Sequence, residues 1–163
     1  MSKPVRRFAA IIAAAALAVS MSACTRAGWV SDAPPAAGVQ TEQDGYKLRN
    51  IVVVADESGQ AILLGGLHSR DDAAEVTGIT VAAEEGYETY GEPVDLGFTA
   101  SIPRGTSVYL DGSETSFSNP ELTPGRLAEV VVTFDGATQL SVHTPVMSAE
   151  HEDFAESFST AAG

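Results

Sequence analysis

Cysteine is almost absent from this chain. Cys24 is the single cysteine among its 163 residues, so no disulfide can form within the chain. The same scarcity excludes metal sites built from thiolates, iron–sulfur clusters and the cysteine-ligated copper centres. The fold must therefore be held together by packing alone.

Basic residues are also scarce. The chain has nine Lys and Arg residues against 22 Asp and Glu residues, which gives a formal net charge of −13 at pH 7. Such an acidic chain repels phosphate groups, so nucleic acid is excluded as a partner, and so is electrostatic binding to anionic lipid. The charge favours solubility and is compatible with cations or a basic protein surface as partners.

The chain has no hydrophobic run long enough to span a membrane. Its longest run lies near the N-terminus. It extends over the 12 residues from Phe8 to Val19, which is too short for a finished transmembrane helix. Lys3, Arg6 and Arg7 precede the run, and Met21-Ser22-Ala23-Cys24 follow it. This order of basic, apolar and small residues predicts a signal peptide over residues 1–23 that ends in a lipoprotein cleavage box.

Cleavage at this box makes Cys24 the first residue of the mature protein. Its thiol is expected to carry a diacylglycerol, and two or more acyl chains hold a protein stably on a membrane. The predicted location is the extracytoplasmic face of the cell membrane, with membrane lipid as a partner through Cys24. The alternative is a plain secreted protein cleaved after Ala23, whose free thiol would be unusual in a secreted chain.

The rest of the chain divides into three segments by composition. Residues 24–46 are rich in Ala, Gly, Ser and Pro without periodicity, which predicts a flexible tether with a reach of roughly 25 Å. Residues 47–147 contain short runs rich in Val, Ile, Thr and aromatics between Gly, Asp, Asn and Pro. This pattern predicts an all-β domain of about seven antiparallel strands in a Greek-key sandwich. Residues 148–163 form an acidic C-terminal tail.

Three stretches of the domain carry the clearest local signals. Residues 94–102 alternate apolar and polar side chains with the period of a half-buried strand. The runs Leu127 to Phe134 and Thr138 to Val146 meet at Asp135-Gly136, a strong hairpin signal. Asp111 to Asn119 is rich in Gly, Ser and Asn and is predicted to be a loop.

The C-terminal tail predicts a short helix. Ser148 can cap it, and Phe154 and Phe158 then share one face because they are four residues apart. Acidic residues border that face. Three interpretations stay open at this point: a frayed end, a segment packed back on the sandwich, or a docking element in which Phe154 and Phe158 contact a partner.

The second half of the domain resembles the copper chaperone family written PCu(A)C, small extracytoplasmic domains that carry copper toward cytochrome oxidase assembly. Ala100 to Leu110 contains Ile-Pro-Arg-Gly and resembles the family's Ile-Pro-x-Gly segment. Leu122 to Phe134 resembles its Leu-x-x-Gly turn and long strand, and Leu140 to Val146 resembles its closing strand. The resemblance implies a cupredoxin-like sandwich, and together with the signal peptide it is similar to the actinobacterial lipoproteins of the LpqE type.

The family's copper ligands are missing from the matching positions. The family holds copper with two His and two Met, including a His-x-Met pair in the loop that corresponds to Asp111 to Asn119. That stretch contains neither residue type, and the upstream pair is equally missing from Glu84 to Tyr90. Because Cu(I) prefers imidazole and thioether donors to carboxylates, the family site is not carried over to any residue here.

One other set of soft ligands is present near the end of the domain. His143, Met147 and His151 are spaced by four residues and supply two imidazoles and a thioether, a plausible copper set. The competing interpretation is structural, with His143 facing outward on a strand, Met147 packed and His151 in a solvated acidic run. No cofactor is expected under that interpretation, and copper is the metal that the set would hold otherwise.

No catalytic residue is predicted. The sequence has no Gly-x-Ser-x-Gly motif and no phosphate-binding glycine loop that opens a helix, so the chain is expected not to be an enzyme. The expected function is that of a membrane-anchored accessory subunit or assembly factor of a membrane protein complex, such as a respiratory oxidase. The alternative is a copper carrier that uses the set His143, Met147 and His151.

Overall fold

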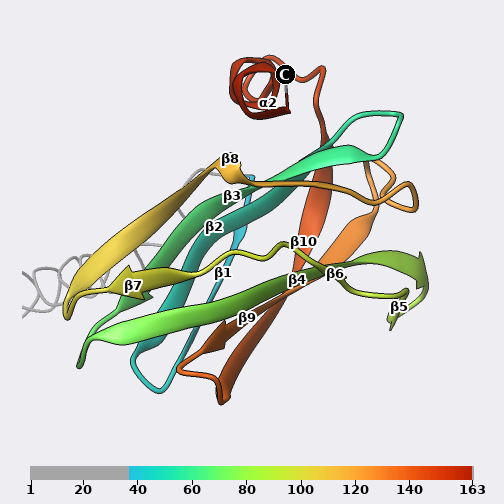
Figure 1. The fold of residues 1–163 in the computed structure, drawn as a ribbon. Helices are drawn as coiled ribbons and strands as arrows, with labels where there is room; N and C mark the ends of the chain where they lie inside the picture. The colour runs from blue at the N-terminus through green and yellow to red at the C-terminus, as the bar shows by residue number, and fades with distance from the viewer. Residues whose placement is uncertain (1–36, 163) are drawn as a thin grey trace, which may run out of the picture. The chain divides into compact units, whose positions relative to one another are not determined.

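Residues 37–162 of the computed structural model are described, and they form ten strands and one short helix (Figure 1). The elements are β1 (Val39–Gln43), β2 (Tyr46–Ala55), β3 (Gln60–Ser69), β4 (Ala74–Gly86), β5 (Thr89–Tyr90), β6 (Val94–Asp95), β7 (Ala100–Ile102), β8 (Thr106–Ser118), β9 (Leu127–Phe134), β10 (Thr138–Ser148) and α2 (Ala155–Ala162). Within this range no helix is long and apolar enough to cross a membrane.

The strands form two sheets that share β10. The first sheet contains β1, β2, β3 and β8, and the second contains β4 and β9 with the short strands β5, β6 and β7 along the outer edge of β4. All pairs are antiparallel except β2 with the end of β10. The predicted all-β sandwich is confirmed, with three short edge strands and one parallel pair in addition.

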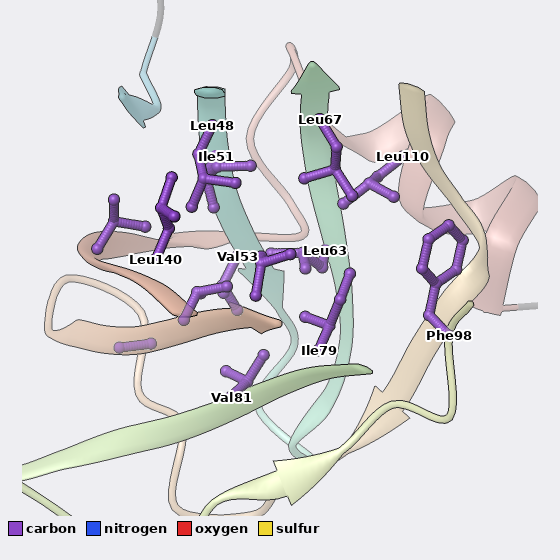
Figure 2. Packing of buried hydrophobic residues seen from close by; sticks show 14 of the residues in the cluster. Leu48, Ile51, Val53, Leu63, Leu67, Ile79, Val81, Phe98, Leu110 and Leu140 are labelled. Carbon is purple, nitrogen blue, oxygen red and sulfur yellow. The ribbon is translucent and has the colours of Figure 1, made fainter. Parts of the chain in front are cut away.

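The core lies between the two sheets (Figure 2). Branched aliphatic side chains fill it, because they pack well on pleated surfaces and have no polar group to satisfy. Each fully buried aliphatic or aromatic side chain contributes about 1.5–3 kcal/mol through its removal from water. The residues labelled in Figure 2 are Leu48, Ile51, Val53, Leu63, Leu67, Ile79, Val81, Phe98, Leu110 and Leu140, all of them buried.

The N-terminal boundary of the domain lies before the one predicted from composition. Residues 39–46, assigned above to the tether, form β1 and a turn into β2, with Val39 opposite Ile51. The turn is Asp44-Gly45, whose φ angles of 51° and 85° are the left-handed values that a tight hairpin needs. The strand was missed because its side chains are mostly polar and half exposed, and only the Asp-Gly pair signals it.

The stretch predicted to be a loop at residues 111–119 is also a strand for most of its length. β8 continues to Ser118 and pairs with β3, although the register slips between Leu64 opposite Asp111 and Ile62 opposite Ser116. The buried Thr115 hydroxyl donates to the carbonyl oxygen of Leu63 at 2.7 Å, which fixes the irregular part. Polar residues on a strand at the edge of a sheet resemble a loop in sequence.

The alternation at residues 94–102 predicts correctly which side chains are buried. It does not predict how this segment pairs with β4. Phe98 and Ile102 are buried, while Asp95 and Thr99 are exposed. The backbone pairs with β4 only at the two ends, as β6 and β7, because Gly97 adopts a φ of 64° and bends the chain between them.

The hairpin between β9 and β10 is confirmed. Asp135 and Gly136 have φ angles of 52° and 68°, and the Ala137 amide donates to the Phe134 carbonyl at 3.0 Å. The Asp135 carboxylate accepts hydrogen bonds from the Glu75 amide at 2.9 Å and the Tyr46 hydroxyl at 2.7 Å. These bonds favour the charged carboxylate, so the pKa of Asp135 lies below its ordinary value.

β10 changes sheet partway along its length. Residues up to Pro145 pair with β9, and Val146 to Ser148 pair in parallel with β2. Pro145 has no amide hydrogen, and the backbone bonds on this side are made by its neighbour, since the Val146 amide donates to the Arg126 carbonyl at 2.9 Å. Next to Pro145, the fully buried Thr144 hydroxyl donates to the Ile51 carbonyl at 2.5 Å and ties β10 to β2.

We expect Thr144→Val to destabilise the domain by about 1–3 kcal/mol, because the isosteric side chain cannot satisfy the buried carbonyl of Ile51. Urea denaturation followed by circular dichroism measures the change. Thr99→Val is the matched control, since Thr99 is exposed, and it should stay within about 0.5 kcal/mol of wild type. Equal urea midpoints for the two variants would show that the hydrogen bond from Thr144 to Ile51 does not stabilise the passage of β10 from β9 to β2.

Candidate functional site

The segment in which the sequence resemblance predicts the upstream copper ligands lies at the end of β4 and in β5. Residues 84–90 form a hairpin whose tip is Tyr87, and Gly86 pairs with Thr89 across it. The Tyr87 side chain is 89% exposed, the largest value among the exposed large hydrophobic residues in the described part of the chain. Sequence reasoning does not single out Tyr87, although an aromatic residue after a Gly at a strand end is a visible signal.

Carboxylates surround this hairpin. Glu84 accepts from the Arg126 guanidinium at 3.4 Å and from the Leu127 amide at 3.3 Å. A Cβ atom on Gly91 would lie 2.9 Å from a carboxylate oxygen of both Glu85 and Glu121, so glycine at this position lets the two side chains approach the backbone. The hairpin, including Tyr87, together with Glu121 and Arg126, is called the β4–β5 end below.

The donor atoms at the β4–β5 end do not suit copper. Its residues offer carboxylate, phenol and guanidinium groups, and none of these is a preferred ligand of Cu(I). Among residues 37–162, no group of three or more His, Cys, Asp or Glu side chains is arranged to hold a metal ion.

His143 lies on the outer side of the second sheet. It faces Glu129 across the β9–β10 ladder, with its Nε2 atom 3.7 Å from a carboxylate oxygen, and its ring is 4.7 Å from that of Tyr90. The pKa of Tyr90 is raised, first by burial and then by the negative charges of Glu84, Glu129 and Glu88. The surroundings of His143 are therefore anionic and aromatic.

Met147 and His151 lie elsewhere. Met147 packs in a small apolar cluster with Val54 and Ile62 on the outer face of the first sheet. The His151 ring lies 5.7 Å from that of Phe154, and its Nδ1 atom accepts from the Asp153 amide at 3.3 Å. His143 and Met147 are four residues apart on one strand, which separates their backbones by about 13 Å. The structure thus does not bring the predicted copper set together.

The tail is packed back on the sandwich. α2 confirms the predicted short helix, and Phe154 and Phe158 pack with Ala161 against Val54 and Ile62. Ser148 accepts from the Glu150 amide at 3.2 Å, so its hydroxyl caps the turn before α2 and not α2 itself. The two phenylalanines proposed as docking residues are half-buried in contacts within the chain.

The lipidation site lies outside the described residues. Cys24 and the signal peptide before it precede residue 37, so the lipid anchor stays a prediction from the sequence.

Comparison with protein-family models and with curated proteins gives no match. Among solved structures, the chain is similar to the apo PCuAC domain from PmoF1, with 10% sequence identity and a TM-score of 0.48 over 68% of this chain and 99% of that one. It is also similar to the copper-bound PCuAC domain from PmoF2, with 14% identity and a TM-score of 0.47 over 68% of this chain and 98% of that one. These are likenesses of fold, and no residue role follows from them.

We expect this protein not to retain Cu(I) against a colour-forming chelator, because His143 lies with Tyr90 and Glu129, away from Met147 and His151. The titration is made with wild type and with His143→Ala, and the two curves should coincide. Retention at submicromolar affinity that is lost in His143→Ala would contradict the separation of His143 from Met147 and His151.

Proposed function

We propose that this chain is a lipid-anchored extracytoplasmic protein whose copper-chaperone-like domain acts as an accessory subunit or assembly factor of a membrane protein complex. A respiratory oxidase is the complex that the family resemblance suggests. The proposed role is binding and not catalysis, and it needs no bound metal.

The observation that carries this proposal is the character of the β4–β5 end. Where the resembling family places copper ligands, this chain has the exposed Tyr87 among acidic side chains. Tyrosine is enriched at protein interfaces, because its ring offers a large contact area and its hydroxyl a hydrogen bond at low entropic cost. An exposed aromatic residue on a hairpin supports a contact surface more than a metal centre.

Tyr109 is similarly exposed, at 80%, but has a structural explanation. A Cβ atom on Gly66 would lie 3.6 Å from the ring of Tyr109, so the ring covers the gap above that glycine in the neighbouring strand. The contacts of the glycines in residues 37–162 do not include the Tyr87 ring, which favours the β4–β5 end as the contact surface.

The proposed anchor limits where such contacts can occur. Fourteen residues separate Cys24 from Val39, the first residue of β1. Even a fully extended chain of this length spans at most about 50 Å. A domain tethered in this way can reach only partners in or near the same membrane.

The alternative copper carrier receives less support. It requires His143 to meet Met147 and His151, whereas His143 contacts Tyr90 and the other two lie near Phe154. The resemblance to a copper chaperone family therefore favours a shared fold with a different use.

The double substitution Met21→Ala and Cys24→Ala tests whether Cys24 anchors the protein and whether the anchor promotes binding to membrane proteins. It turns the lipoprotein box into an ordinary signal peptidase site with small residues, so the domain should be exported without lipid. We expect it to leave the membrane fraction and to co-purify with membrane proteins at least about tenfold less than wild type, since tethering raises the effective concentration of a partner. Quantitative mass spectrometry of detergent-solubilised membranes measures both effects.

Wild-type levels of the double variant in washed membranes would show that Cys24 is not the anchor. A wild-type protein that is anchored but purifies alone would contradict the accessory role.

A further inference from the structure

α2 packs on a patch of apolar side chains on the outer face of the first sheet. Val54 and Ile62 are fully buried there although they point away from the main core, and Ala149 is nearly so. Leu64, Met147 and Phe154, with Phe158 and Ala161 of α2, complete a separate cluster. Figure 1 shows α2 lying against the first sheet at the end near β8. The name "helix seat" is used below for Val54, Ile62, Leu64 and Met147.

The edge strand is shaped to admit the helix. Gly112 lies in the irregular part of β8 with a φ of 95°, and a Cβ atom there would lie 3.0 Å from both Ala161 and Ile62. Only glycine combines this backbone conformation with the absence of a side chain. The strand therefore departs from regular pairing at the point where α2 approaches it.

In the described part of the chain, the side-chain contacts between α2 and the seat are apolar. No residue of α2 is fully buried, and its side-chain hydrogen bonds are local, from Ser159 and Thr160 to the Glu156 carbonyl. An isolated helix of eight residues is unstable in water, so α2 is helical only while it is docked.

Charge opposes the docking. The tail carries Glu150, Glu152, Asp153 and Glu156, and no Lys or Arg follows residue 126. β8 beneath the helix carries acidic residues, Asp111 and Glu114, and no basic ones. Like charges on both partners repel each other, and among residues 37–162 no ion pair joins the tail to the first sheet. Within the described residues, the side chains that hold α2 on the sheet are Phe158 and Ala161, together with Phe154 just before the helix.

We propose that α2 is a removable latch and that the helix seat is a receptor for an amphipathic helix. When α2 leaves as a unit, the apolar seat and both phenylalanines become available together. A partner helix with two large apolar side chains four residues apart fits the vacated seat in place of α2. The use of the seat by a partner rests on the function proposed above, whereas the latch itself is a property of the isolated chain.

Amide hydrogen exchange of the full lipidated chain in detergent tests the latch. The amides of α2 should exchange at least about 100-fold faster than those at the centre of the β9–β10 ladder, because α2 opens without unfolding of the sandwich. Gly112→Ala should raise the exchange rate of the α2 amides about tenfold further, since the new methyl group pushes against Ala161.

Gly105→Ala is the matched control. Gly105 also has a positive φ, 70°, but a Cβ atom there would meet nothing within 4 Å. Both substitutions strain the backbone, and only Gly112→Ala crowds the helix. Equal α2 rates in the two variants, or α2 amides in wild type that exchange together with the β9–β10 core, would overturn the latch.

The receptor role is tested in trans without any partner protein. A fluorescent synthetic peptide of residues 148–163 is titrated against the full chain carrying Phe154→Ala and Phe158→Ala, whose own tail cannot compete for the seat. The peptide should bind this variant at least about tenfold more tightly than it binds wild type. Failure to bind the folded variant would overturn the receptor role and leave the membrane function proposed above untouched.

Discussion

The passage of β10 from one sheet to the other is the constraint on which the rest of the structure depends. Its first part completes the second sheet beside β9, and its last three residues join the first sheet beside β2. The buried bond from Thr144 to Ile51 ties the strand at the crossing. With no disulfide available, this shared strand and the aliphatic core beside it hold the two sheets together.

The same crossing of β10 separates two of the candidate copper ligands, His143 and Met147. His143 lies before it, on the outer face of the second sheet with Tyr90, and Met147 lies after it, against the first sheet with Val54. A spacing of four residues in sequence thus becomes a separation between two surfaces. At the β4–β5 end, the exposed Tyr87 lies among carboxylates, and this is the surface through which we propose that the domain contacts another protein.

Sequence reasoning predicted the features that depend on local chemistry. The hairpin at Asp135-Gly136 follows from the left-handed backbone that these residues tolerate, and the buried positions at residues 94–102 follow from alternation. It missed β1 and the second half of β8, because polar edge strands gain their order from pairing with β2 and β3 and not from their own residues. The packing site of α2 could not be predicted from the sequence either. Its apolar residues Val54 and Ile62 face away from the main core, but in sequence they look like core residues.

Site-specific photocrosslinking from position 87 in the full lipidated chain, carried out in native membranes, tests the account most directly. A photoreactive phenylalanine analogue replaces Tyr87, and the same replacement at Tyr109 serves as the control, because that side chain is similarly exposed but covers Gly66. The account predicts a single crosslinked membrane protein from position 87 and none from position 109. Equal crosslinking from both positions, or none from position 87, would contradict a specific contact surface at the β4–β5 end.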